Sequence, residues 1–259
     1  MRPRSAERRP AFVATRAVMG TVASIHVHDD AAPEQISVAV DGVFAELERL
    51  ESMFSTYRSD SEISAINAGS LSPTTASPEV VDVLDACTWL EHASNGSFDI
   101  RPDGAGGRLD PAGFVKGWAA ERSAGALVRC GLEHWYVSVG GDVLVHGEPS
   151  PGEQWSVGIA DPHRPGCVRA TLRVAAGAVA TSGTAERGLH LWDPATGTAA
   201  EDFASVTVIG PSLTWADAFA TVAFVKGAAG LAWIEGFADY HAVAVHHDGT
   251  VECTSAVRC

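Results

Sequence analysis

The residues with the clearest chemical potential are Asp217 and Thr221, which lie four positions apart in the segment A-D-A-F-A-T. The apolar residues around them follow a helical period, so the carboxylate and the hydroxyl are expected on one face of a helix. Two oxygen donors at this spacing suit a hard cation such as Mg²⁺, which keeps further positions for water and phosphate. The alternative is a threonine hydroxyl that bonds back to a helix carbonyl beside a solvated aspartate. Spacing alone leaves both interpretations open.

A histidine stands upstream of this pair. His190 lies between two leucines in H-L-W-D-P-A-T-G, a segment that follows the triplet Thr181-Ser182-Gly183. The triplet has the composition of a helix start. A positioned histidine can act as a general base, whereas a histidine packed between leucines can equally be a satisfied core residue.

Two loops add groups that could meet a ligand. In F-S-T-Y-R-S-D-S-E-I-S, Tyr57 could stack on a planar ligand and Arg58 could meet an anion. The alternative is a capped turn, because serine and aspartate cluster where helices start. The glycine-rich segment before Lys116 is a plausible phosphate cradle at a helix start. It matches neither the P-loop nor the dinucleotide-binding motif, so a purely structural turn is the other interpretation.

Composition limits the classes of partner. The chain has 259 residues, 46% of them hydrophobic, which suffices for a core in one large or two small domains. Its formal charge is −14, from 32 acidic and 18 basic residues. This excess argues against nonspecific binding to nucleic acid or to anionic membranes. A phosphorylated ligand would need a local cation or aligned backbone N–H groups, which makes a metal more plausible.

The cysteines and the N-terminus bear on the cellular location of the protein. The five cysteines are scattered and contain no C-x-x-C, which favours reduced structural thiols over a disulfide framework or a zinc site. The basic N-terminus is not followed by an apolar core of signal-peptide length, and no apolar run is long enough to span a bilayer. We therefore expect a cytoplasmic protein without a membrane partner.

Hydrophobic patterning predicts the elements. Residues 1–12 are rich in Arg and Pro and are expected to form a disordered leader. A strand is expected over residues 23–27, a long amphipathic helix from Pro33 and a second helix from Pro78. The later part of the chain is mostly strand-like and ends in a hairpin at Asp248-Gly249. Helices and strands in blocks, without βαβ alternation, favour an α+β fold.

Several motifs follow one another along the chain: M-G-T, F-S-T-Y-R-S-D-S-E-I-S, S-F-D, L-D-P-A-G-F-V-K-G, V-G-G-D, W-x-V-G-I-A-D-P, T-S-G, H-L-W-D-P-A-T-G, V-T-V-I-G-P-S and A-D-A-x-x-T. In this order they resemble the ApbE family of FAD:protein FMN transferases, which attach FMN to a threonine or serine of a target flavoprotein. The resemblance runs from Met19 to about Gly227. It implies an α+β fold of mixed, mostly antiparallel sheets packed with helices, with T-fold-like halves, as a single domain over residues 13–259.

The resemblance also implies roles for particular residues. Mg²⁺ would be held by Asp217, Thr221 and a backbone carbonyl near Gly113, and His190 would be the general base. Contacts to FAD would come from several segments, namely Met19, Tyr57, Ser97, Phe98, Asp99, Asp110, Lys116 and the backbone near Trp192. In this chemistry a hydroxyl attacks the FMN-side phosphorus and AMP leaves, while Mg²⁺ neutralises pyrophosphate charge and the base accepts the hydroxyl proton.

Three departures from the family pattern are visible. Ala220 stands where some members carry a second acidic residue, the insertion between S-F-D and L-D-P is short, and the lipoprotein leader of exported members is missing. The expected activity is an Mg²⁺-dependent transfer of FMN from FAD to a protein acceptor. Hydrolysis of FAD to FMN and AMP at the same site is one alternative, and a catalytically weak FAD-binding protein is another.

Overall fold

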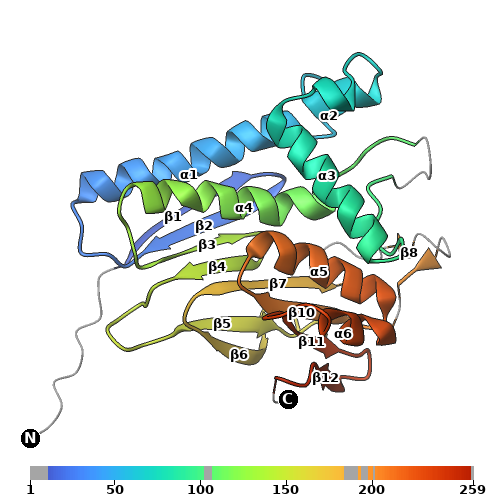
Figure 1. Ribbon diagram of the computed structural model, residues 1–259. Coiled ribbons are helices and arrows are strands. Elements are labelled where there is room, and N and C mark those ends of the chain that lie inside the picture. The colour runs from blue at the N-terminus through green and yellow to red at the C-terminus, as the bar shows by residue number, and fades with distance from the viewer. Residues whose placement is uncertain (1–10, 102–106, 184–191, 194–197, 201, 258–259) are drawn as a thin grey trace, which may run out of the picture.

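An eight-stranded antiparallel sheet forms the framework of the molecule (Figure 1). The structure is a computed structural model that describes residues 11–101, 107–183, 192–193, 198–200 and 202–257. The sheet order is β1-β2-β3-β4-β7-β10-β11-β12, and β5-β6 and β8-β9 form two small two-stranded sheets. The strands are β1 (Phe12–Val18), β2 (Thr21–Val27), β3 (Trp135–Val139), β4 (Asp142–His146), β5 (Trp155–Ala160), β6 (Val168–Val174), β7 (Gly177–Gly183), β8 (Trp192–Asp193), β9 (Thr198–Ala199), β10 (Ser205–Gly210), β11 (His241–Val245) and β12 (Val251–Cys253).

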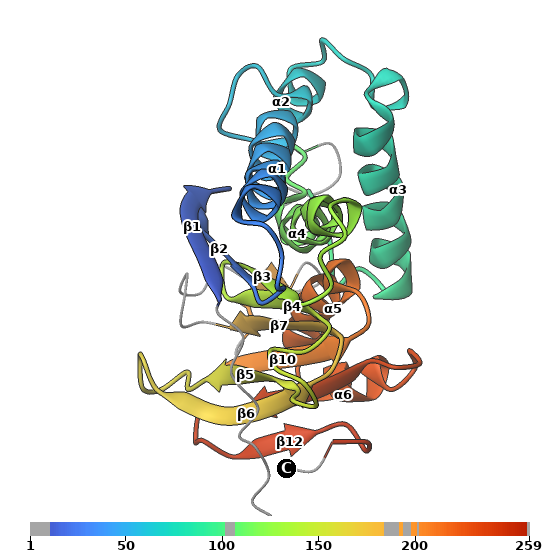
Figure 2. The same cartoon turned by 90° about the vertical axis from the view of Figure 1, so that its left-hand side faces the viewer.

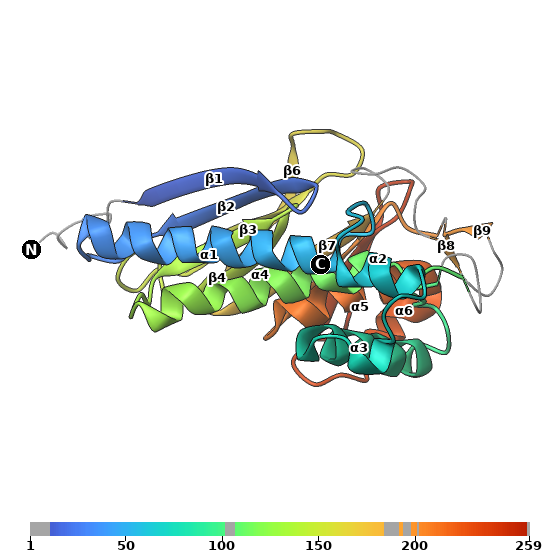
Figure 3. The same cartoon turned by 90° about the horizontal axis from the view of Figure 1, so that it is seen from above.

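Helices cover one face of this sheet (Figures 1 and 2). They are α1 (Pro33–Phe54), α2 (Glu62–Asn67), α3 (Pro78–Ala93), α4 (Ala112–Arg129), α5 (Leu213–Lys226) and α6 (Ala228–Ile234), with a short 3-10 turn η1 (Pro73–Thr75). Seen from above, α1 and α4 run side by side over the sheet (Figure 3). None of the helices in the described part of the chain combines the length and the apolar character that a membrane span needs.

The long helix α1 follows from its sequence. Pro33 stands in its first turn, where a missing N–H costs no hydrogen bond. The apolar residues spaced alternately four and three apart are buried, as the periodicity predicts: Ile36, Val40, Val43, Leu47, Leu50 and Phe54. The predicted helix from Pro78 is confirmed as α3.

The sheet has a buried row on each face. Toward the helices, Ala23, Ile25 and Val27 of β2 are fully buried, which confirms the predicted strand. On the opposite face the β5–β6 hairpin packs on β4 and β7 through a smaller core of Val145, Trp155, Val157, Val174 and Val179. Figure 2 shows this hairpin beside the sheet, away from α1 and α4. The fold is therefore α+β with antiparallel pairing, as expected.

One local prediction is wrong. Thr181-Ser182-Gly183 does not start a helix, because these residues end strand β7, which pairs with β4 on one side and β10 on the other. The Thr181 hydroxyl lies 2.9 Å from the hydroxyl of Thr207 on the neighbouring strand. All three residues pair with β10, and this pairing outweighs the local preference of serine and threonine for helix starts. At the other end of the chain, Phe12 of the expected leader already pairs with Val27 in the sheet.

The prediction of reduced cysteines is wrong at one position. Cys253 is in a disulfide bond, whereas Cys87, Cys130 and Cys167 are free. A disulfide requires the Cα atoms of two cysteines to lie within about 7 Å of each other, and the spacing of cysteines along the chain does not predict this distance.

Candidate active site

Helices α4 and α5 approach closely at Gly117. A side chain there would place its Cβ 2.7 Å from the Cβ of Asp217 and 2.7 Å from the carbonyl oxygen of Leu213, so only glycine allows this contact. The Gly117 N–H donates to Asp217 Oδ2 over 2.9 Å. The start of α5 is fixed by Ser212, whose hydroxyl accepts from the Trp215 N–H. Asp217 is thus held against the backbone of α4.

Three charged side chains meet beside this contact. The Lys116 ammonium lies 2.6 Å from Asp142 Oδ2 and 3.3 Å from Asp217 Oδ1. The side chains of Asp142 and Asp217 are only 2% and 3% exposed, whereas that of Lys116 is 24% exposed. Asp142 Oδ1 accepts from the Thr181 N–H of β7 over 3.0 Å. We call Lys116, Asp142 and Asp217 the buried charge cluster, and it joins α4, α5, β4 and β7.

The charges of this cluster do not balance. Burial lowers the pKa of Lys116, but attraction to Asp217 and Asp142 outweighs it, and the net shift of that pKa is upward. Burial raises the pKa of Asp142 to about 7, repulsion from Asp217 adds to this shift, and Lys116 opposes it. Two carboxylates facing one ammonium leave an excess of negative charge when both are ionised. A bound cation would offset this excess.

Hydroxyl groups lie next to the cluster. The Thr221 hydroxyl, one turn after Asp217 on α5, is 3.1 Å from the Ser182 hydroxyl of β7. Asp217 is buried rather than solvated, so the alternative of a surface Asp–Thr pair does not describe this helix. The described residues contain no group of three or more His, Cys, Asp or Glu side chains placed to share a metal. A cation here would use Asp217, hydroxyl or carbonyl oxygens, and water.

The β3–β4 turn borders the Lys116 side chain, and the start of β2, which follows the β1–β2 turn, lies beside that turn. In the β1–β2 turn, Met19 and Gly20 both adopt positive φ, and Met19 packs partly buried against the main core. In the β3–β4 turn, Gly140 has φ +58°, and a Cβ there would lie 3.2 Å from the Thr21 hydroxyl and 3.6 Å from Lys116 Cδ. The start of β2, the β3–β4 turn and the lysine stem are therefore neighbours.

The S-F-D and L-D-P segments meet at the start of α4. The Asp110 N–H donates to the Ile100 carbonyl over 2.7 Å, and the Asp110 carboxylate accepts from the Ala112 N–H. Phe98 is 5% exposed, and its ring lies 3.5 Å from the position of a Cβ on Gly113. Next to them, Ser97 donates its N–H to the Ser94 carbonyl and Asp99 accepts from the Arg101 N–H.

The model of the ApbE family matches residues 19–105 and 100–244. The chain belongs to the ApbE family. Among its curated relatives, the FAD:protein FMN transferase of Treponema pallidum is 26% identical, over 81% of this chain and 77% of that protein. The FAD:protein FMN transferase of Escherichia coli K12 is 31% identical, over 58% of this chain and 47% of that protein. The alignment thus spans about half the length of the latter.

Solved ApbE structures share the fold. The ApbE protein of Thermotoga maritima superimposes with a TM-score of 0.82 at 22% identity, covering 95% of this chain and 98% of that one. The flavin transferase ApbE of Vibrio cholerae gives a TM-score of 0.82 at 23% identity with the same coverage. The ApbE architecture is therefore retained at low sequence identity.

Not every residue expected from the ApbE motifs joins the cluster. Tyr57 is 97% exposed, and no described contact joins its ring to the charge cluster. Its loop is a capped turn, because the Ser61 side chain caps α2 and Arg58 pairs with Asp60 over 2.8 Å. His190 lies outside the described residues. Trp192 belongs to β8, where it pairs with Ala199.

The sequence interpretation assigned no role to three residues of this candidate site. Asp142, Gly117 and Ser182 make the contacts described above, and all three stand inside family motifs, V-G-G-D, V-K-G and T-S-G. A carboxylate directly after a glycine pair was the available indication for Asp142. Its partner could not be inferred, because the ion pair joins separate elements.

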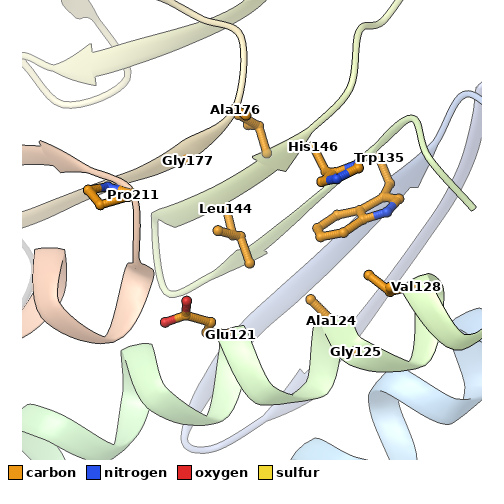
Figure 4. Close-up of a pocket in the computed structure, with 11 residues that line it drawn as sticks. Glu121, Ala124, Gly125, Val128, Trp135, Leu144, His146, Ala176, Gly177 and Pro211 are labelled. Carbon is orange, nitrogen blue, oxygen red and sulfur yellow. The ribbon is translucent and has the colours of Figure 1, made fainter. Parts of the chain in front are cut away.

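A shallow groove of about 320 Å³ lies along the second half of α4 (Figure 4). Its walls are mostly apolar and include Leu144, Trp135 and Val128. Its carboxylate, Glu121, accepts from the Ser212 hydroxyl and from the N–H and hydroxyl of Thr214, so it caps the start of α5. No member of the buried charge cluster lines this groove.

Proposed function

We propose that this protein is an Mg²⁺-dependent transferase that moves the FMN moiety of FAD onto a threonine or serine hydroxyl of a target flavoprotein and releases AMP. The observation that carries the proposal is the buried charge cluster, whose excess negative charge lies where several ApbE motifs converge. The names of the curated relatives support the reaction class.

The residues fit a hard cation. Asp217 and Thr221 supply a carboxylate and a hydroxyl from one face of α5, and the Gly113 carbonyl would complete the protein ligands. Ser182 adds a hydroxyl 3.1 Å from that of Thr221. Ala220 is fully buried in the apolar core, so the chain relies on few protein oxygens and more water. When bound, Mg²⁺ neutralises charge on the pyrophosphate.

The remaining residues bind FAD and move the proton. The partly exposed Lys116 ammonium binds a phosphate oxygen, and the segments at Met19, Ser97-Phe98-Asp99, Asp110 and Trp192 surround the dinucleotide. The exposed Tyr57 ring is available to stack on a planar group. His190 accepts the proton of the acceptor hydroxyl, whose oxygen bonds to the FMN-side phosphorus as the bond to the AMP oxygen breaks.

The test is incubation of the protein with FAD, Mg²⁺ and a candidate acceptor, followed by mass spectrometry of the acceptor. We expect the acceptor to gain the mass of FMN and AMP to appear in equal amount. Replacement of the acceptor residue by alanine, or chelation of the metal, should abolish labelling. If AMP and free FMN form at the same rate with and without acceptor, and no acceptor gains mass, the protein is an FAD hydrolase.

We also propose the cytoplasmic location that the sequence predicts. One observation favours a different compartment. The disulfide at Cys253 favours an oxidising compartment, because structural disulfides rarely persist in the cytosol. Cell fractionation combined with thiol labelling of Cys253 separates the two locations. Recovery of the protein in the cytosolic fraction with a free Cys253 thiol would support the sequence-based expectation.

A further inference from the structure

We propose that Asp142 is a positioning residue that holds the Lys116 ammonium back from Asp217 and so leaves the Asp217 carboxylate available to a divalent cation. The inference rests on the proposed function, because it concerns the carboxylate assigned to the metal. It adds a role for a residue that would touch neither FAD nor the cation.

Asp142 is fixed in direction. It begins β4, pairs there with Val139 of β3, and its Oδ1 accepts from the Thr181 N–H of β7. Its Oδ2 is buried, and the Lys116 ammonium lies 2.6 Å from it. The strand therefore aims one carboxylate oxygen at the lysine.

The Lys116 ammonium is placed between two carboxylates. Its stem passes the β3–β4 turn, where a Cβ on Gly140 would lie in ordinary van der Waals contact with Lys116 Cδ, at 3.6 Å. Among the described contacts, the ammonium has two carboxylate partners, Asp142 and Asp217, and it lies closer to Asp142. The choice between these partners decides where the positive charge sits.

The oxygen at issue is Asp217 Oδ1. The other oxygen, Oδ2, already accepts from the Gly117 N–H, so Oδ1 is the one that faces the ammonium at 3.3 Å. An ammonium and a divalent cation compete for the same carboxylate oxygen, because each neutralises its charge. With Asp142 uncharged, Asp217 is the remaining buried partner, and the ammonium closes on it.

A double-mutant cycle on metal affinity tests this role. Mn²⁺ is titrated into the full-length protein without FAD, and its affinity is measured by electron paramagnetic resonance, so the result does not depend on turnover. The variants are Asp142→Asn, Lys116→Gln and the double variant. Asp142→Asn should weaken Mn²⁺ binding at least about tenfold, whereas in the Lys116→Gln background it should change the affinity less than about twofold.

The matched control is Asp161→Asn. Asp161 is also a buried carboxylate, 5% exposed, but its ion pair is with Arg164 and it contacts neither Lys116 nor Asp217. Its Mn²⁺ affinity should equal that of the unaltered protein. Circular dichroism of each variant establishes that it is folded. If Asp142→Asn does not fold, Asp142→Glu replaces it in the cycle, because the longer side chain keeps the charge but moves the carboxylate away from its place beside the ammonium.

The outcomes separate this inference from the proposed function. An equal loss of Mn²⁺ affinity in both lysine backgrounds would mean that Asp142 acts through its own charge, and the positioning role would be wrong. Unchanged affinity in Asp142→Asn would overturn it as well. If the unaltered protein binds no Mn²⁺, the metal site of the proposed function fails, and the positioning role fails with it.

Discussion

Helix α4 carries two clusters in which a basic side chain meets carboxylates, and the two clusters lie in different surroundings. Near its start, Lys116 meets Asp142 and Asp217, whose side chains are at most 3% exposed. Farther along, Arg122 meets Glu46 of α1 and Glu79 of α3, with side chains 45%, 22% and 23% exposed. The second cluster links three helices at the surface, where ion pairs contribute little to stability. The first is buried, where desolvation is costly.

The two clusters also differ in charge balance. At the surface, Arg49 joins Arg122, so two arginines face two glutamates. In the interior, two aspartates face one lysine. An exposed network with matched charges is explained by packing and solubility alone. A buried cluster with an unmatched carboxylate costs free energy that packing does not explain, so it indicates a functional site.

The largest expected effect concerns Asp217. Asp217→Asn should lower the rate of FMN transfer by about 10²-fold or more, because the variant lacks the carboxylate assigned to the cation. The melting temperature should change little, since the amide still accepts from the Gly117 N–H. The measurement is AMP release at limiting Mg²⁺, with Glu46→Gln of the surface cluster as control. Unaltered turnover in Asp217→Asn would show that the assignment of Asp217 to the metal is wrong.

A smaller effect is expected at Gly117 of α4, and Gly125 of the same helix serves as its control. Gly117→Ala forces α4 and α5 apart and should reduce the free energy of unfolding by about 1–3 kcal/mol. Gly125→Ala is the matched control, because its Cβ would meet only the end of the Arg129 side chain, at 3.1 Å. This control should be neutral or stabilising by up to about 1 kcal/mol. Urea unfolding of both variants measures the difference, and equal stabilities would contradict the close helix contact.

The smallest effect is expected at the surface cluster. Arg122→Ala should lower the free energy of unfolding by no more than about 1 kcal/mol, and part of this loss should disappear at high salt because exposed charges are screened. Some loss should persist, since the guanidinium also lies over the Trp118 ring. Urea unfolding at two salt concentrations, together with the transfer assay, checks this. A large fall in activity would show that the two clusters are coupled.

The sequence predicted those features that depend on local pattern. The period of apolar residues identified α1 and placed Asp217 and Thr221 on one helix, and both are confirmed. The period did not reveal the partners of Asp142 and Asp217, because these partners are distant in the chain. Gly117 and Asp217, for example, lie 100 residues apart. The prediction of a helix start at Thr181-Ser182-Gly183 was wrong, because the conformation of these residues is decided by their pairing with β10.

The family motifs predicted roles for particular residues, which periodicity does not. They did not predict the surroundings of each residue. Lys116 was assigned to FAD from its motif, and only the folded chain reveals that two carboxylates hold its ammonium. Tyr57 illustrates the converse, because its motif is present while its ring is almost fully exposed. Burial is a property of packing between distant segments, and a linear motif does not encode it.

The order of strands in the sheet has a consequence for how the chain folds. Strands β2 and β3 are neighbours, with Val27 beside Trp135, yet helices α1 to α4 separate them in the chain. Pairing them closes a long loop, which costs conformational entropy and slows folding. The chain from α4 onward already contains every member of the buried charge cluster and the strands from β3 to β12. The cluster nevertheless closes a loop of similar length, because Gly117 and Asp217 lie 100 residues apart. Assembly of the buried charge cluster and pairing of β2 with β3 therefore both depend on distant contacts, and both slow folding.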